Sequence, residues 1–91
     1  MKLFWARPAL KDAARLYEFI AADNPVIAAN VLEGIRAGVT RLVQFPQLRE
    51  RVDGYEPREV RRIYIGPYEV RYEIAEDAVR ILRLWHARER R

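Results

Sequence analysis

Cysteine and serine are both absent from this chain of 91 residues, and Thr40 is its only threonine. Without thiols, the chain has neither a disulfide nor a thiolate metal site. Nucleophilic catalysis through a hydroxyl or thiol is effectively excluded as well. His86 is the only histidine, so a zinc site built from histidine and cysteine cannot be assembled. We therefore expect no metal and no cofactor.

Long hydrophobic runs are also missing. No apolar stretch approaches the length that crosses a membrane, and Lys2, Arg7 and Lys11 interrupt the region where a signal peptide would be apolar. Glycine-rich phosphate loops and the signatures of zinc fingers and helix-turn-helix motifs are lacking. Hydrophobic residues make up 51% of the chain and charged residues 33%, which is typical of a globular protein. We expect one domain over residues 1–91, in the cytoplasm and with no membrane partner.

The formal net charge of +4 is carried almost entirely by arginine, since Lys2 and Lys11 are the only lysines among 17 basic residues. Arginine pairs bidentately with carboxylate or phosphate, so a cluster of arginines favours an anionic partner. A GC-rich genome produces the same overall bias. Only the clustering of arginines in the last third of the chain is therefore evidence of a site.

The first quarter of the chain predicts a strand followed by an amphipathic helix. Residues 2–6 are short, apolar and aromatic, and Pro8 fits the first turn of a helix. Apolar residues then recur at three- and four-residue steps up to about residue 22 or 23, while Asp12 and Arg15 fall on the opposite side. The predicted apolar face consists of Leu10, Ala13, Ala14, Tyr17, Ile20 and Ala21.

A second helix is predicted to begin at Asn24 and Pro25, because asparagine is a strong N-cap and proline is favoured at the first helical position. Gly34 and Gly38 lie four residues apart and predict a close approach to the first helix. Residues 47–57 are polar and predict a loop. The apolar face of the second helix consists of Ile27, Val31, Ile35, Val39 and Leu42.

The last third of the chain predicts three strands joined by tight turns at residues 66–67 and 76–77. Together with the first half, this gives the order β-α-α-β-β-β: a two-layer α+β domain with a mostly antiparallel sheet and both helices on one face. Trp85 is expected on the buried face, with Val79 and Ile81. Period-two alternation in the middle strand assigns Tyr68, Val70, Tyr72 and Ile74 to the buried face and Glu69, Arg71 and Glu73 to the exposed face.

The remaining polar residues suit one reaction, which is the cleavage of RNA through its ribose 2′-hydroxyl. That chemistry needs a base, an acid and cations that stabilise developing phosphorane charge. His86 is the candidate acid or base, Glu59 the candidate base, and Arg61, Arg62, Arg71 and Arg88 the candidate cations. The alternative is structural: a lone histidine at the end of a strand is more often a surface residue, and alternating arginines more often form a solvated face.

Several segments along the chain together resemble the RelE/ParE superfamily of type II toxins. The resemblance covers essentially the whole chain and implies a toxin that a cognate antitoxin neutralises. The segments are Asn24-Pro25 followed by Ala28-Ala29, Phe45-Pro46, Arg58-Glu59-Val60, Pro67-Tyr68-Glu69-Val70-Arg71-Tyr72-Glu73-Ile74, and Ile81-Leu82-Arg83-Leu84-Trp85-His86-Ala87-Arg88.

Two positions favour the ParE-like branch, whose members inhibit DNA gyrase and so block replication. Glu69 stands where the mRNA-cleaving RelE-like branch tends to carry an arginine, and Ala87 follows His86 where that branch often has a tyrosine. The alternative is a RelE-like, ribosome-dependent mRNA endoribonuclease that uses Glu59, Arg61, Arg71, His86 and Arg88. A third possibility is a non-toxic module that binds antitoxin and serves autoregulation.

The resemblance also implies partners. An acidic, amphipathic segment of the antitoxin is expected along the helices and the exposed sheet face, opposite Arg61, Arg71 and Arg88. The arginine-rich tail, Arg88, Arg90 and Arg91, is the expected contact with gyrase. Operator DNA is expected to be contacted only through the antitoxin, and ribosome and mRNA only in the alternative function.

Overall fold

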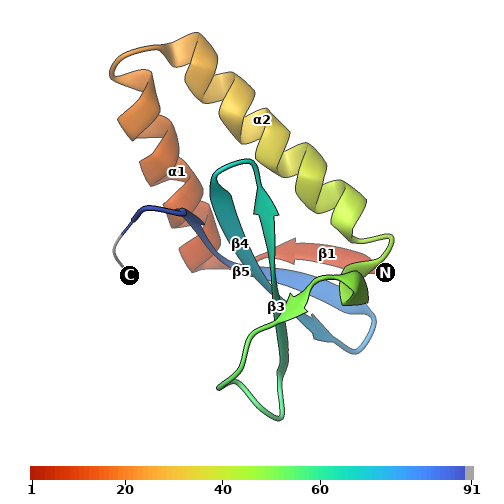
Figure 1. The fold of residues 1–91 in the computed structure, drawn as a ribbon. Helices are drawn as coiled ribbons and strands as arrows, with labels where there is room; N and C mark the ends of the chain where they lie inside the picture. The colour runs from red at the N-terminus through yellow and green to blue at the C-terminus, as the bar shows by residue number, and fades with distance from the viewer. Residues whose placement is uncertain (90–91) are drawn as a thin grey trace.

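A computed structural model describes residues 1–89 and confirms the predicted α+β fold (Figure 1). Residues 47–57, predicted as a loop, also contain the last two residues of a 3-10 helix that begins at Pro46. They contain a strand of two residues as well, which is too short to show an alternating pattern. The elements are β1 (Lys2–Trp5), α1 (Arg7–Ala21), α2 (Pro25–Leu42), η1 (Pro46–Leu48), β2 (Glu50–Arg51), β3 (Glu59–Ile65), β4 (Tyr68–Ala75) and β5 (Ala78–His86).

The five strands form one mixed sheet in the order β1-β5-β4-β3-β2. Strand β1 runs parallel to β5, and the other neighbours are antiparallel. The predicted two-residue turns are confirmed, because two residues separate the end of β3 at Ile65 from β4, and two separate the end of β4 at Ala75 from β5. Gly66 (φ 59°) and Glu76 (φ 56°) adopt the left-handed conformation in these turns.

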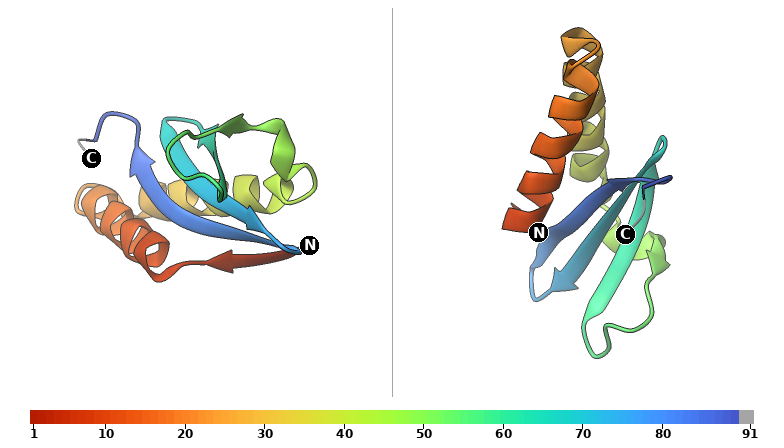
Figure 2. Two further views of the ribbon diagram at one scale, coloured as in Figure 1. Left: turned by 90° about the horizontal axis from the view of Figure 1, so that it is seen from below. Right: turned by 90° about the vertical axis from the view of Figure 1, so that its left-hand side faces the viewer.

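Both helices pack on one face of the sheet, and the core lies between the two layers (Figures 1 and 2). The side chain of Asn24 accepts a hydrogen bond from the Ile27 N–H at 3.1 Å, which confirms the predicted N-cap of α2. Burial raises the pKa of Tyr72 to about 12, and its hydroxyl donates a hydrogen bond to the Pro46 carbonyl. The buried core consists of Ala9, Leu16, Ile35, Val39, Leu42, Ile63, Val70, Tyr72, Val79, Ile81 and Leu84.

The predicted face of α1 is wrong by about one position. Leu10 is 55% exposed and Tyr17 41% exposed, whereas the buried residues of the helix are Ala9, Asp12 and Leu16. Small alanines make α1 apolar over more than one stripe, so its periodicity did not define which stripe meets the sheet. Contact with β5 selects the stripe that contains Asp12.

The close approach predicted from the two glycines also has a different partner. A Cβ atom on Gly38 would lie 2.7 Å from Cδ1 of Ile65 in β3, while one on Gly34 would meet nothing within 4 Å. Gly38 therefore allows α2 to pack closely against the sheet, whereas the prediction was close packing of α2 against α1. Beyond the sheet, the connected ends of α1 and α2 project as a helical hairpin (Figure 2), on which Phe19 is 79% exposed.

Candidate functional site

A β-bulge in β5 determines which side chains form the candidate site. Arg71 pairs with Arg83 and Tyr72 with Ile81, so β5 has one extra residue, Leu82, between these two pairs. The extra residue inverts the alternation of inward and outward side chains. Ile81 therefore faces the helices, whereas Arg83 lies on the open sheet face with Arg71.

The same bulge corrects the prediction for Trp85. Trp85 pairs with Glu69 and lies on the open face, not with Val79 and Ile81 on the helix-facing side. It is nonetheless buried, because the guanidinium groups of Arg71 and Arg83 cover its ring at 4.9 and 5.0 Å from the centroid. Each contact is a cation–π interaction, which fixes both arginines relative to the indole.

Glu69, predicted as an exposed residue, is fully buried beneath these arginines. Its carboxylate accepts a hydrogen bond from Nε of Arg71 at 2.9 Å and lies 3.7 Å from Nη1 of Arg62. A buried carboxylate needs such partners, because an isolated charge in the protein interior is very costly. Glu69 thus neutralises the charges of Arg71 and Arg62 from the interior side of the cluster. The outer edges of the two guanidinium groups face solvent on the open face of the sheet.

Asp12 of α1, predicted on the solvent side of its helix, completes the cluster. Only 5% of its surface is exposed, and it accepts hydrogen bonds from Nε of Arg83 at 2.8 Å and from the Leu84 N–H at 2.9 Å. Burial by itself raises the pKa of Asp12, but the bonds and the charge of Arg83 outweigh burial, so the pKa lies below its usual value. The spacing of Asp12 between Ala9 and Leu16 was a signal in the sequence, since residues three and four apart share a helix face.

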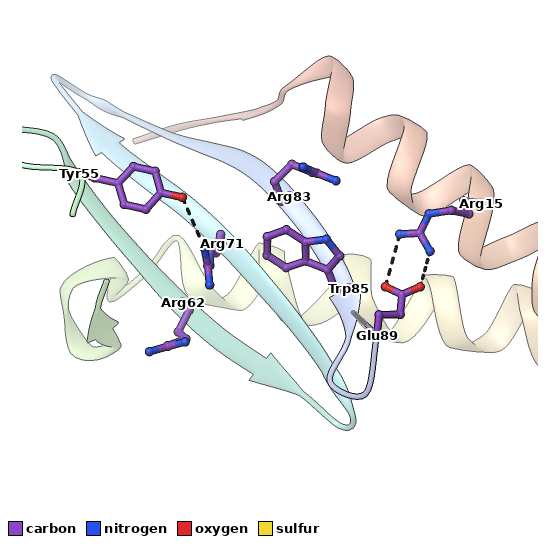
Figure 3. Close-up of a pocket in the computed structure, with 7 residues that line it drawn as sticks. All are labelled: Arg15, Tyr55, Arg62, Arg71, Arg83, Trp85 and Glu89. Carbon is purple, nitrogen blue, oxygen red and sulfur yellow. Dashed lines mark hydrogen bonds and ion pairs between the residues drawn. The ribbon is translucent and has the colours of Figure 1, made fainter. Parts of the chain in front are cut away.

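Two cavities meet over this cluster. The larger, here the arginine groove (Figure 3), has a volume of about 920 Å³, and the smaller, here the apolar pocket, has a volume of about 480 Å³. Arg15 and Glu89 line both and are joined by an ion pair. The arginine groove is lined by Arg15, Tyr55, Arg62, Arg71, Arg83, Trp85 and Glu89, and the apolar pocket by Arg15, Leu16, Phe19, Ile20, Tyr68, His86, Arg88 and Glu89.

The charges of the arginine groove are already balanced. Arg83 pairs with Asp12, Arg71 with Glu69, and Arg15 with Glu89, while Arg62 pairs with Glu50 at 3.0 Å. Nε of Arg62 is buried and has no hydrogen-bond partner among the described residues. In such an arrangement, a carboxylate of a partner can replace a carboxylate of the protein on an arginine guanidinium group. The arrangement is less suited to binding a polyanion, which would require a net positive charge in the groove.

The predicted ribonuclease residues do not come together in the described structure. Glu59 and Arg61 bind each other on the helix-facing side, where Arg61 also donates to the Arg49 carbonyl at 2.7 Å. His86 lies on that side too, but pairs with Tyr68, six residues along β4 from the position opposite Glu59. At about 3.3 Å per residue, Glu59 and His86 are about 20 Å apart.

Of the remaining predicted residues, Arg71 lies on the opposite face of the sheet, in the arginine groove. Arg88 lines the apolar pocket, and its backbone N–H donates to Nδ1 of His86 at 3.1 Å. The His86 ring meets Tyr68 edge-on, with 5.4 Å between the ring centroids. Arg90 and Arg91, predicted to contact the target, lie outside the described residues.

Within residues 1–89, no group of three or more His, Cys, Asp or Glu side chains is placed to hold a metal ion. Among the same residues, no helix combines the length and the apolar character that crossing a membrane requires. The ion pairs of the arginine groove show what the site can bind: its arginines pair with carboxylates, beside a pocket for apolar side chains.

Comparison with known proteins places this architecture in a family. Residues 3–91 match the model of the ParE toxin of the type II toxin-antitoxin system parDE. The chain is 27% identical over 86 residues to Toxin RelE2 of Caulobacter vibrioides, covering 94% of each chain. The fold is similar to a chain in a solved structure of the chromosomal ParDE TA system from P. aeruginosa, with a TM-score of 0.76, 23% identity and 92% of each chain covered.

Proposed function

This chain belongs to the ParE toxin family of type II toxin-antitoxin systems, and from that membership we propose that it inhibits DNA gyrase and is neutralised by a cognate antitoxin. In this function the protein acts by binding, and it has one surface for the antitoxin and one for the target.

Action by binding is supported by the dispersal of the residues that RNA cleavage would require. General acid–base catalysis needs the acid, the base and the charge-stabilising cation within reach of one scissile bond. Glu59 and His86 are about 20 Å apart along β4, and Arg71 is on the other face of the sheet. This separation is the observation on which we favour gyrase inhibition over ribosome-dependent mRNA cleavage.

The antitoxin surface is proposed to be the arginine groove together with the adjoining apolar pocket. An acidic, amphipathic segment matches both parts, because its carboxylates can pair with Arg71 and its apolar residues can cover Phe19. Arg88, which lines the pocket, is proposed to contact the same segment. Arg61 is left out of this surface, because Glu59 and the Arg49 carbonyl hold it on the helix-facing side.

The target surface is proposed to be the arginine-rich end of the chain. Arg88 is exposed after the last strand, and Arg90 and Arg91 follow it in the sequence. Arginine is enriched at the energetically dominant positions of protein interfaces. Because Arg88 belongs to both proposed surfaces, an antitoxin bound there would also hinder the target, which accounts for neutralisation.

The deciding experiment is a supercoiling assay with purified gyrase and purified protein, with and without the antitoxin encoded beside it. We expect inhibition that the antitoxin reverses and that Glu59→Gln leaves unchanged, since Glu59 pairs with Arg61 outside both proposed surfaces. Unchanged supercoiling at high excess of the protein would contradict the proposal. Expression in a susceptible cell adds a second readout: filamentation supports gyrase inhibition, whereas an abrupt halt in protein synthesis supports mRNA cleavage.

A further inference from the structure

Arg15 and Glu89 form an ion pair (Figure 3), and both residues line the arginine groove as well as the apolar pocket. Both carboxylate oxygens of Glu89 contact the Arg15 guanidinium, and one of them also accepts a hydrogen bond from the His86 N–H at 3.1 Å. Arg15 belongs to α1 and Glu89 to the last described turn. The pair therefore ties the C-terminal end of the described chain to the first helix.

The two cavities that meet at this pair have complementary linings. On one side lie the guanidinium groups of Arg71 and Arg83, and on the other the side chains of Leu16, Phe19 and Tyr68. Phe19 is exposed for 79% of its surface, which is high for a phenylalanine. The arginine groove and the apolar pocket together are here called the trough. A helix with one apolar stripe and flanking carboxylates matches the trough, and its carboxylates would approach Arg15 at the middle.

We propose that Glu89 occupies the position of a partner's carboxylate, and that an acidic residue of the antitoxin's amphipathic helix replaces it on Arg15 and releases Glu89 from α1. The inference rests on the proposed function, because it takes the antitoxin as the partner. It adds a mechanism by which the bound antitoxin frees Glu89 from α1 while it contacts the neighbouring Arg88.

The exchange is physically easy because it conserves charge at Arg15. One carboxylate leaves the guanidinium as another arrives, so no buried charge is created, and the released Glu89 becomes hydrated. Both members of the pair are partly exposed, with side-chain exposures of 47% for Arg15 and 27% for Glu89. A partly exposed ion pair changes an equilibrium constant by a factor of only about two to five. The apolar contact between the antitoxin and the pocket can therefore outweigh the loss of the pair.

The test measures the affinity of the antitoxin, purified as the product of the adjoining reading frame, for variants of each member of the pair. Glu89→Gln removes the internal competitor, so we expect about two- to fivefold tighter binding. Arg15→Gln removes the anchor of the incoming carboxylate, so we expect binding at least about fivefold weaker. A purely structural ion pair predicts the same direction for both substitutions, and that result would overturn the inference.

The exposed pair of Arg36 and Glu33 on α2 provides matched controls, because Arg36→Gln and Glu33→Gln change the net charge in the same way without touching the trough. We expect both controls to alter affinity less than twofold. Equal effects of Glu33→Gln and Glu89→Gln would show that only net charge matters and would overturn the inference.

A second measurement uses the unmodified protein, so it does not depend on the folding of any variant. In the complex, the 1H–15N heteronuclear NOE of the Glu89 amide is expected to fall relative to the free protein, because release makes that amide mobile on the picosecond-to-nanosecond timescale. An unchanged or higher value would overturn the inference and leave the proposed function intact. Failure of the antitoxin to bind the unmodified protein at all would instead contradict the proposed function.

Discussion

The carboxylate of Asp12 in α1 accepts a hydrogen bond from the backbone N–H of Leu84 in β5 at 2.9 Å. Strand β1 pairs with β5 only as far as Ile81, and α1 follows β1 after one residue. Asp12 therefore satisfies a backbone donor at the edge of β5 where strand pairing has ended. The same carboxylate binds Arg83, so one side chain joins the helix layer, the sheet edge and the arginine groove.

Asp12→Asn is expected to lower the free energy of unfolding by about 2 to 3 kcal/mol, since hydrogen bonds to a buried charged group are the stronger ones. Urea denaturation followed by circular dichroism measures this change. Glu18→Gln, an exposed substitution on the same helix, serves as the control and should stay within about 0.5 kcal/mol of the unmodified protein. A similar small change for Asp12→Asn would contradict the role assigned to the carboxylate.

Stability is expected to fall in acid, with Asp12 contributing to the loss. The pKa of Asp12 in the folded state lies below its ordinary value of 3.8, so the folded state binds protons less readily than the unfolded state. Its contribution is therefore fully present above about pH 5 and is lost as the pH falls through the folded-state pKa. The free energy of unfolding, measured between pH 7 and pH 2, should decline less steeply in Asp12→Asn. Parallel curves for the two proteins would argue against this assignment.

Glu69→Gln is expected to destabilise the protein by about 2 to 4 kcal/mol, because Arg71 and Arg62 would keep their charges over a neutral buried group. Glu73→Gln is the matched control on the same strand face, since its partner Arg58 is exposed; its effect should remain below about 1 kcal/mol. Adding Arg71→Met to the Glu69→Gln variant should restore part of the lost free energy of unfolding. A double-mutant cycle, with each free energy measured by denaturant unfolding, would show this.

The two glycines of α2 are expected to respond oppositely to alanine. Gly34→Ala should stabilise the protein by about 0.5 to 1 kcal/mol, because alanine favours the helix and the site is open. Gly38→Ala gains the same propensity but forces Ile65 to move, and overpacking of this kind costs about 1 to 3 kcal/mol. Thermal unfolding should therefore rank Gly38→Ala below Gly34→Ala. Ile65→Val in the Gly38→Ala background should narrow the gap, and equal melting temperatures for the two glycine variants would disprove the contact.

Arg88→Ala is expected to weaken inhibition of supercoiling more than about fivefold while leaving the free energy of unfolding within about 0.5 kcal/mol. The reason is that its exposed side chain belongs to the proposed target surface and to no buried cluster. Arg7→Ala, an exposed arginine at the start of α1, is the control for loss of one positive charge. An identical loss of inhibition in both variants would show that only the positive charge matters, and would contradict a specific role of Arg88 in target binding.

The helices, the turns and the order of elements followed from the sequence because their signals are local. Asn24 and Pro25 act on the first turn of the helix that they begin, and the turn at Gly66 needs only the conformational freedom of that residue. The alternation in β4 also predicted correctly that Val70 and Tyr72 face the core. These features depend on neighbours within about four residues, so they can be recognised without the fold.

The candidate site depended on contacts between distant segments, so much of it could be found only in the tertiary structure. Arginines in the last third of the chain were predicted to form a surface, and Arg71 does line the groove. The bulge at Leu82, however, is a matter of register between two strands, and it alone puts Trp85 and Arg83 on the open face. The burial of Asp12 depends in turn on where β1 ends along β5. Sequence periodicity thus determined the elements, while strand register and helix docking decided which charged side chains meet, because those contacts join residues about 70 positions apart.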